Sequence, residues 1–331
     1  MKAPHFWSSG LDPKSREAAP LTRALLTPLT WLYLWGLNRK LASVIPEIVP
    51  VPVICIGNLT TGGTGKTPVA ETIRSRITSL GHRAATLSRG HGGREQGPLK
   101  VDAAVHTFRD VGDEPLLLAA TGEAWIGRSR VAAARDMASA GVEVVLMDDG
   151  HQNPSLQKDF TFVVIDAGAP FGNGHVLPKG PLRETIPAGL SRADAVILMG
   201  DGPVPREVAA STKPVLRARL ESAAPVPAGR LVAFAGIGRP EKFFDSLKAA
   251  GADLRDAIPY ADHHPYSAGD LDFLRGLARS EGALLITTAK DHVRLPAEMR
   301  AETRVHPVSA VFEDPEVLDA LLVPIFKHSQ P

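Results

Sequence analysis

Short apolar runs alternate with helical periodicity along most of the chain. Runs typical of strands lie at residues 51–56, 84–88, 142–147, 160–165, 195–199, 231–235 and 283–287. Apolar spacing and helix start or stop signals indicate helices at residues 69–80, 116–120, 129–140, 240–250 and 267–280. Strands that alternate with helices favour parallel pairing, so the sequence predicts an α/β fold with helices flanking a parallel sheet.

A glycine-rich segment directly follows the first apolar run and has the layout of a phosphate-binding loop. It consists of Thr60, Thr61, Gly62, Gly63, Thr64, Gly65, Lys66 and Thr67. Its backbone N–H groups can surround an anion, Lys66 can reach the outer phosphates, and the Thr67 hydroxyl can hold Mg²⁺. The usual pattern has glycine at position 60, so the loop is a variant. Nucleotide binding is the leading hypothesis, and a glycine-rich turn without a ligand is the alternative.

The chain has 331 residues, a formal net charge of +1 and 44% hydrophobic residues. No basic cluster with interleaved aromatic residues accompanies this near-neutral charge, which argues against a nucleic-acid partner. The length suffices for two domains. A stretch rich in Ala, Pro and Val at residues 223–229 is a candidate linker, so we expect a main domain at 46–225 and a smaller α/β domain at 226–331.

Residues 1–45 form a separate N-terminal segment in this interpretation. Its uncharged stretch, residues 24–38, is shorter than the roughly 20 apolar residues of a spanning helix and contains Pro28. We expect a kinked or two-part helix in a membrane interface, with Trp31, Tyr33 and Trp35 at headgroup depth. A helix packed on the protein core is the alternative.

Three groups of acidic and histidine residues are candidates for chemistry. Asp148 and Asp149 follow the most apolar strand, where carboxylates can hold Mg²⁺ beside a phosphate loop, although they can also cap a turn. Asp113 and Glu114 sit at a helix start, which capping alone would explain. The sequence Asp-His-His at residues 262–264 suits acid–base chemistry better than metal binding.

Taken together, these motifs resemble the tetraacyldisaccharide 4'-kinases of lipid A biosynthesis. The resemblance rests on residues 57–68, 88–90, 112–115, 148–152, 178–184, 262–264 and 288–291, which follow in order over residues 20–325. It implies a phosphate-loop kinase domain and a smaller C-terminal domain that closes over the active site. It further implies transfer of the γ-phosphate of ATP, with Mg²⁺, to the 4'-hydroxyl of an acylated glucosamine disaccharide 1-phosphate.

The resemblance also implies roles for particular residues. Lys66 and Thr67 hold phosphate and Mg²⁺, Asp148 and Asp149 hold the metal, and Asp113 with His263 removes the proton of the sugar hydroxyl. Further candidates for substrate contact are Arg89, His91, Glu114, Gln152, Arg183 and Glu184. Family members commonly have Tyr where this chain has His91, which leaves stacking on the sugar from that position open.

The family works as a peripheral protein on the cytoplasmic face of the bacterial inner membrane, and no protein partner is implied. Two other classes of protein remain as alternatives. A partition-type switch ATPase would have its signature Lys at position 61, where this chain has Thr61. A non-catalytic nucleotide-binding adaptor would leave Asp113 and His263 without a role.

Overall fold

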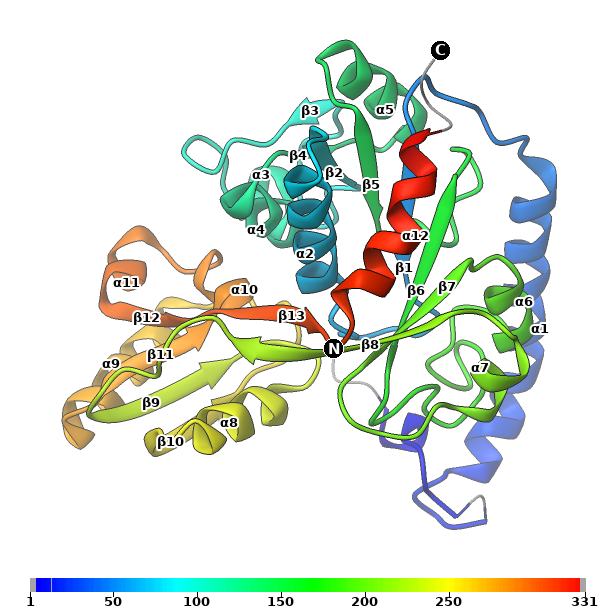
Figure 1. The fold of residues 1–331 in the computed structure, drawn as a ribbon. Coiled ribbons are helices and arrows are strands. Elements are labelled where there is room, and N and C mark those ends of the chain that lie inside the picture. Colours follow the sequence, from blue (N-terminus) through cyan, green and yellow to red (C-terminus); the bar gives the residue numbers. More distant parts are fainter. Residues whose placement is uncertain (1–3, 13, 328–331) are drawn as a thin grey trace.

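The computed structural model describes residues 4–12 and 14–327. The outermost parts of the predicted terminal segments, residues 1–3 and 328–331, and residue 13 lie outside this range. Two sheets organise the chain (Figure 1). The larger sheet has nine strands in the order β13-β8-β7-β6-β1-β5-β2-β4-β3, and the smaller has four in the order β10-β9-β11-β12.

The strands of the larger sheet are short and mostly buried. They are β1 (Val53–Gly57), β2 (Ala84–Ser88), β3 (Leu99–Lys100), β4 (Ala124–Ile126), β5 (Val144–Asp148), β6 (Phe160–Asp166), β7 (Ala195–Met199), β8 (Val215–Ser222) and β13 (Val308–Phe312). Only the β8–β13 and β3–β4 pairs are antiparallel. The predicted α/β fold with a parallel sheet flanked by helices is therefore confirmed.

Helices cover both faces of this sheet. They are η1 (His5–Trp7), α1 (Pro20–Ser43), α2 (Lys66–Ser79), α3 (Phe108–Val111), α4 (Asp113–Thr121), α5 (Arg130–Ser139), α6 (Ile186–Ser191), α7 (Arg206–Ala210) and α12 (Pro315–Lys327). Strand side chains alternate between the faces, so Val144 and Leu146 pack with α2 and α12 while Val145 and Met147 pack with α5. The sheet is buried on both sides, which explains its continuous apolar strands.

The smaller sheet is entirely parallel and projects to one side of the larger body (Figure 1). Its strands are β9 (Arg230–Ala235), β10 (Asp253–Pro259), β11 (Leu284–Thr288) and β12 (Thr303–His306). Its helices are α8 (Pro240–Ala249), α9 (Ala268–Glu281), α10 (Ala289–His292) and α11 (Ala297–Glu302).

The last part of the chain belongs to the larger sheet. The predicted domain at 226–331 is therefore wrong in its C-terminal part. β13 pairs with β8 of the larger sheet, and Leu318, Leu322 and Phe326 of α12 join the core beside α2. The chain therefore crosses between the two bodies twice, at the expected linker 223–229 and again at Pro307. The second crossing depends on strand pairing between distant segments, which local sequence patterns do not encode.

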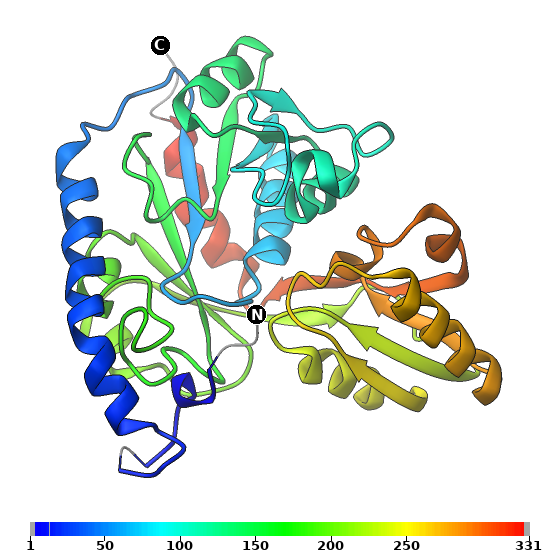
Figure 2. The same ribbon diagram turned by 180° about the vertical axis from the view of Figure 1, so that it is seen from behind.

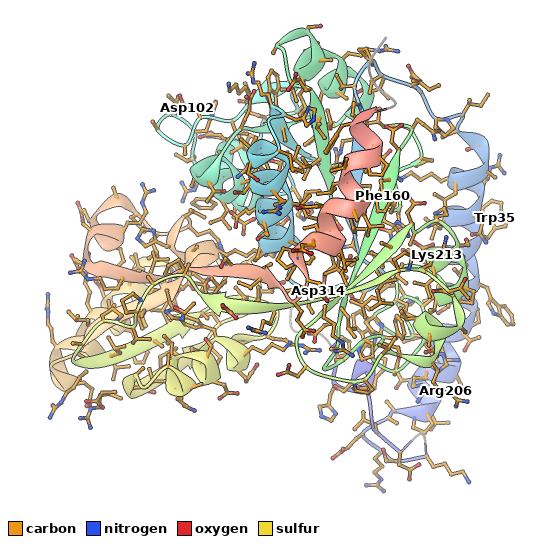
Figure 3. All side chains as sticks on the ribbon, in the orientation of Figure 1. Trp35, Asp102, Phe160, Arg206, Lys213 and Asp314 are labelled. Atoms are coloured by element: carbon orange, nitrogen blue, oxygen red, sulfur yellow. The ribbon has the colours of Figure 1, made fainter. Side chains whose placement is uncertain are left out.

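Helix α1 lies along the flank of the larger body that faces away from the smaller sheet (Figures 1 and 2). It is one continuous helix with Pro28 inside it, so of the two expected forms the two-part helix is wrong and the kinked helix stays a prediction. Tyr33 and Leu34 pack against the core, whereas Trp31 and Trp35 are 68% and 60% exposed. The Trp35 side chain points outward from the body (Figure 3). Among the described residues, none of the helices has the length and apolar content needed to span a membrane.

Candidate active site

The glycine-rich loop lies between the carboxyl end of β1 and the start of α2, as the sequence predicts. Gly65 precedes the helix with a φ of +85°, a conformation that favours glycine, and Lys66 is the first helical residue. Buried Asn58 braces the loop from within. Its Nδ2 atom lies 2.8 Å from the Thr60 carbonyl oxygen and 3.3 Å from Thr64 Oγ1. The loop is therefore preformed by contacts that the motif itself does not reveal.

The segment 178–184 packs along the first half of this loop. The Thr61 N–H donates to the Pro181 carbonyl at 2.8 Å, and the Arg183 N–H donates to the Leu59 carbonyl at 2.7 Å. The Arg183 guanidinium reaches both carboxylate oxygens of Asp149 at 3.0 Å. These bonds place a predicted substrate residue, Arg183, between the phosphate loop and the paired aspartates.

The two adjacent aspartates at the end of β5 have different environments. Asp148 is 2% exposed, and its Oδ1 atom has no hydrogen-bond partner among the described residues. Burial, reinforced by the nearby Glu114 carboxylate, raises the pKa of Asp148 to about 7 although Lys66 acts in the opposite direction. Asp149 pairs with Arg183 and with Lys66, whose Nζ lies 3.5 Å away. Burial opposes ionisation of Asp149, but these two cations outweigh it and lower its pKa.

This donor set fits Mg²⁺. Asp148 offers a buried carboxylate oxygen without a partner in the described part of the chain, and the half-buried Thr67 lies at the start of α2. The described residues contain no cluster of three or more His, Cys, Asp or Glu side chains arranged to hold a metal. Mg²⁺ commonly binds through one or two carboxylates, substrate phosphates and water, so a cage of protein ligands is not needed.

Asp113 and His263 lie in contact although 150 positions separate them in the sequence. Asp113 opens α4 on the larger body and is 6% exposed, while His263 belongs to the loop after β10 of the smaller sheet. His263 Nδ1 lies 2.8 Å from Asp113 Oδ2. The backbone of His263 has a φ of +56°, which is unusual for a residue with a side chain and indicates local strain.

Cations from the smaller body surround this pair. Arg294 Nε lies 3.3 Å from Asp113 Oδ2, and Lys290 Nζ lies 3.0 Å from His263 Nε2 and 3.3 Å from Glu114 Oε1. Burial opposes ionisation of Asp113, but His263, Lys290 and Arg294 together lower its pKa. Since an ammonium group only donates, Nε2 of His263 accepts from Lys290, which leaves the ring proton on Nδ1, the nitrogen that lies closest to Asp113. Sequence reasoning gave Lys290 and Arg294 no role, although Lys290 belongs to a motif that carried the resemblance.

A buried carboxylate fixes the element that carries these cations. Asp291 of α10 is fully buried and accepts from the Gly236 N–H at 2.8 Å and from the Tyr266 hydroxyl at 2.7 Å. Arg294 Nη2 lies 3.3 Å from the same Asp291 oxygen and donates to the Gly236 carbonyl at 3.1 Å. The contacts join α10 to the loops that follow β9 and β10, so Lys290 and His263 belong to one hydrogen-bonded unit.

The other predicted substrate residues fall into two groups. Arg89 and His91 are exposed, and the His91 carbonyl packs so closely on Gly112 that a Cβ at Gly112 would lie 2.4 Å from it. Glu184 is only 2% exposed and accepts from Gln152 at 2.8 Å and from Arg192 at 2.5 Å. Gln152 and Glu184 therefore join the loops that follow β5 and β6 to each other beside the phosphate loop.

The smaller body also touches the phosphate loop directly. Gly238 lies so near that a Cβ on it would be 3.1 Å from the Gly63 nitrogen. Beside this contact, Arg239 and Lys242 each reach Asp166, at the end of β6, at 2.8 Å. The two bodies thus meet over the candidate nucleotide site, and the Asp113–His263 pair is assembled from both of them.

Comparisons with known proteins identify the family of this chain. A family model described as tetraacyldisaccharide-1-P 4'-kinase matches residues 22–327. The chain belongs to this family. Relatives named tetraacyldisaccharide 4'-kinase include those of Hyphomonas neptunium, 70% identical over 99% of both chains, and of Maricaulis maris, 51% identical over 97% of this chain and 96% of the relative.

A solved structure has the same fold. It is a crystal structure of LpxK from Aquifex aeolicus in complex with ATP, which is 26% identical and has a TM-score of 0.71, covering 92% of this chain and 99% of that one. No observation favours the partition-type ATPase. Its signature lysine is absent at Thr61, whose N–H is instead bonded to the Pro181 carbonyl.

Proposed function

We propose that this chain transfers the γ-phosphate of ATP to the 4'-hydroxyl of tetraacyldisaccharide 1-phosphate, a step of lipid A biosynthesis. The observation that carries the proposal is the 2.8 Å contact between Asp113 and His263 beside a preformed phosphate loop. A switch ATPase or a nucleotide-binding adaptor needs no such pair, whereas an alcohol acceptor must lose a proton.

The phosphate loop and Lys66 bind the nucleotide in this mechanism. Lys66 neutralises charge on the outer phosphates, and Thr67 with Asp148 would hold Mg²⁺. When bound, Mg²⁺ supplies further neutralisation of the charge that shifts between the phosphates. Asp149 keeps Lys66 and Arg183 in place, because both cations contact its carboxylate.

Asp113 acts as the general base. Its carboxylate takes the proton of the 4'-hydroxyl while the hydroxyl oxygen forms a bond to the γ-phosphorus and the bond from that phosphorus to the β,γ-bridging oxygen breaks. ADP leaves with the electrons of the broken bond. His263 orients Asp113 through its Nδ1 proton, and Lys290 fixes His263 in that tautomer.

Helix α1 is proposed to bring the enzyme to its lipid at the cytoplasmic face of the bacterial inner membrane. Its exposed apolar side chains suit the interface, and Arg39 and Lys40 near its end suit anionic headgroups. A cavity of about 490 Å³ runs from α1 toward the site and is lined by Leu32, Tyr33, Gly36, Leu37, Lys40, Gln152 and Arg183. Its lining therefore combines residues of α1 with Arg183, which pairs with Asp149.

The direct test is transfer of radiolabelled γ-phosphate to purified tetraacyldisaccharide 1-phosphate in mixed micelles. Wild-type protein should form the 4'-phosphorylated product, and Lys66→Ala should lower kcat by about 10²-fold or more. Lys248→Ala, an exposed change on α8, serves as the matched control and should leave kcat unchanged. Absence of product from folded wild-type protein would overturn the proposed function.

A further inference from the structure

Two neighbouring arginines at the carboxyl edge of the larger sheet have no carboxylate partner among residues 4–12 and 14–327. Arg130 is the first residue of α5 and is only 4% exposed. Its Nη1 donates to the Gly127 carbonyl at 2.5 Å, but its Nε has no partner among these residues. Arg89 follows β2, is exposed and likewise forms no ion pair within the described chain.

A buried arginine normally has more hydrogen-bond partners than Arg130 has among the described residues. Arg74, 3% exposed, donates to the carbonyls of Leu118 and Glu123 and to the Thr121 hydroxyl at 2.6–3.1 Å. Arg130 makes only one such bond. Burial, followed by repulsion from Arg89, lowers the pKa of Arg130 to about 10, so its guanidinium stays charged at neutral pH. A buried cation with open donors next to a second cation is stabilised when an anion binds between them.

The location of the pair points to the reaction centre. The Gly127 N–H donates to the Ser88 carbonyl at 3.1 Å, which joins the start of α5 to the end of β2. In the pairing of β2 with β5, Leu87 lies opposite Met147, which puts Ser88 level with Asp148. Ser88 Oγ is buried there and has no hydrogen-bond partner in the described part of the chain. Ser88 Oγ and Arg130 Nε, which have no hydrogen-bond partner among the described residues, thus both lie on the side of the sheet edge next to Asp148, the proposed metal ligand.

We propose that Arg89 and Arg130 form a binding site for a phosphate group, beside the Asp148 carboxylate at the end of β2 and the start of α5. The planar guanidinium donates two parallel hydrogen bonds to phosphate oxygens, which a lysine cannot do. This inference rests on the proposed function and deepens it. The phosphate comes either from the γ-position of ATP or from the 1-phosphate of the lipid, and the strand register that puts Ser88 level with Asp148 favours the γ-phosphate.

The test compares nucleotide affinities by calorimetry for wild-type protein, Arg130→Lys, Arg130→Met and Arg89→Met. The ligands are MgADP and the magnesium complex of the nonhydrolysable analogue AMPPNP. Arg135→Met is the matched control, because Arg135 lies on the same helix but is exposed and pairs with Glu47. Arg89→Met removes an exposed side chain, so it remains informative if the Arg130 variants fail to fold.

For a γ-phosphate site, AMPPNP affinity should fall about 10- to 100-fold in Arg130→Met, Arg130→Lys and Arg89→Met. MgADP affinity should change less than about twofold, and the control should match the wild type. For a lipid phosphate site, both nucleotides should bind normally. KM should then rise for the 1-phosphate lipid and stay unchanged for the same lipid without its 1-phosphate.

Unchanged AMPPNP affinity together with an unchanged KM for the lipid, in folded Arg89→Met and in any folded Arg130 variant, would overturn the inference. That result differs from failure of the proposed function, which would show as absence of phosphate transfer by the wild-type protein itself. Each variant is therefore assayed beside wild-type protein with confirmed turnover.

Discussion

Replacing Asp113 and His263, singly and together, tests whether the two side chains act as one catalytic unit. Asp113→Asn removes the negative charge of the proposed base while keeping its shape. His263→Gln removes the ring whose Nδ1 lies 2.8 Å from Asp113 Oδ2. The neighbouring variant His264→Gln is the matched control, since His264 contacts Asp270 at 3.1 Å and not Asp113.

The expected magnitude follows from the geometry. A positioned general base contributes roughly 10²- to 10⁴-fold to the rate, about 3 to 5 kcal/mol of barrier. Independent groups would lose these factors multiplicatively. Since the 2.8 Å contact makes His263 act through Asp113, the double variant should lose less than about tenfold more than the worse single variant.

The assay is kcat at saturating lipid and MgATP, with MgATP affinity measured separately. Affinity should change less than about threefold, because neither side chain is assigned to the phosphates. Fully multiplicative losses in the double variant would show that the two groups act independently. A wild-type rate in either single variant would remove that residue from the mechanism, and a loss in His264→Gln equal to that of His263→Gln would point to a general disturbance of the loop.

Three further predictions concern Lys290, the proposed metal ligand Asp148 and the exposed tryptophans of helix α1. Burial raises the pKa of Asp113 and Lys290 helps to lower it, so Lys290→Met should raise that pKa and move the acid limb of kcat to higher pH; an unshifted pH profile would contradict this role. Asp148→Asn should raise the Mg²⁺ concentration needed for half-maximal activity by about tenfold or more, whereas a titration that overlays the wild type would reduce Asp148 to a structural role. Replacing exposed Trp31 and Trp35 together by Ser should weaken binding to anionic vesicles by about 10- to 100-fold without lowering thermal stability, and unchanged cosedimentation would place the membrane contact elsewhere.

Local sequence patterns predicted the strands of the parallel core closely. The expected strand at 195–199 is β7 without change, and the run at 142–147 became β5 with bounds shifted by one to two residues. Strands β8, β10, β12 and β13 escaped this reasoning. Several of their positions are exposed or half-buried, so their hydrophobic pattern is weak. Their place depends on pairing partners far away in the sequence.

The candidate site divides in the same way. The spacing of glycines, Lys66 and Thr67 predicted a phosphate loop because these residues are close together in the sequence. Pairing of Asp113 with His263 came from family resemblance and not from spacing, since nothing local links positions 150 apart. The contact of Lys290 with His263 was not predicted, although its motif was noticed. Most lysines lie exposed on the surface, so a lysine in the sequence does not by itself indicate such a contact.

The sequence by itself determined several strands of the parallel core, the glycine-rich loop, the set of candidate carboxylates and the family. These properties depend on local periodicity, turn chemistry and motif spacing. Only the tertiary structure decided that Asp148 keeps a carboxylate oxygen without a partner among the described residues, while Asp149 is held by Lys66 and Arg183. It also decided that Lys290 and Arg294 from the smaller body surround Asp113 on the larger one. Adjacent residues of the same type acquire different roles because burial and charge separation are set by distances in space, which the linear order of residues does not contain.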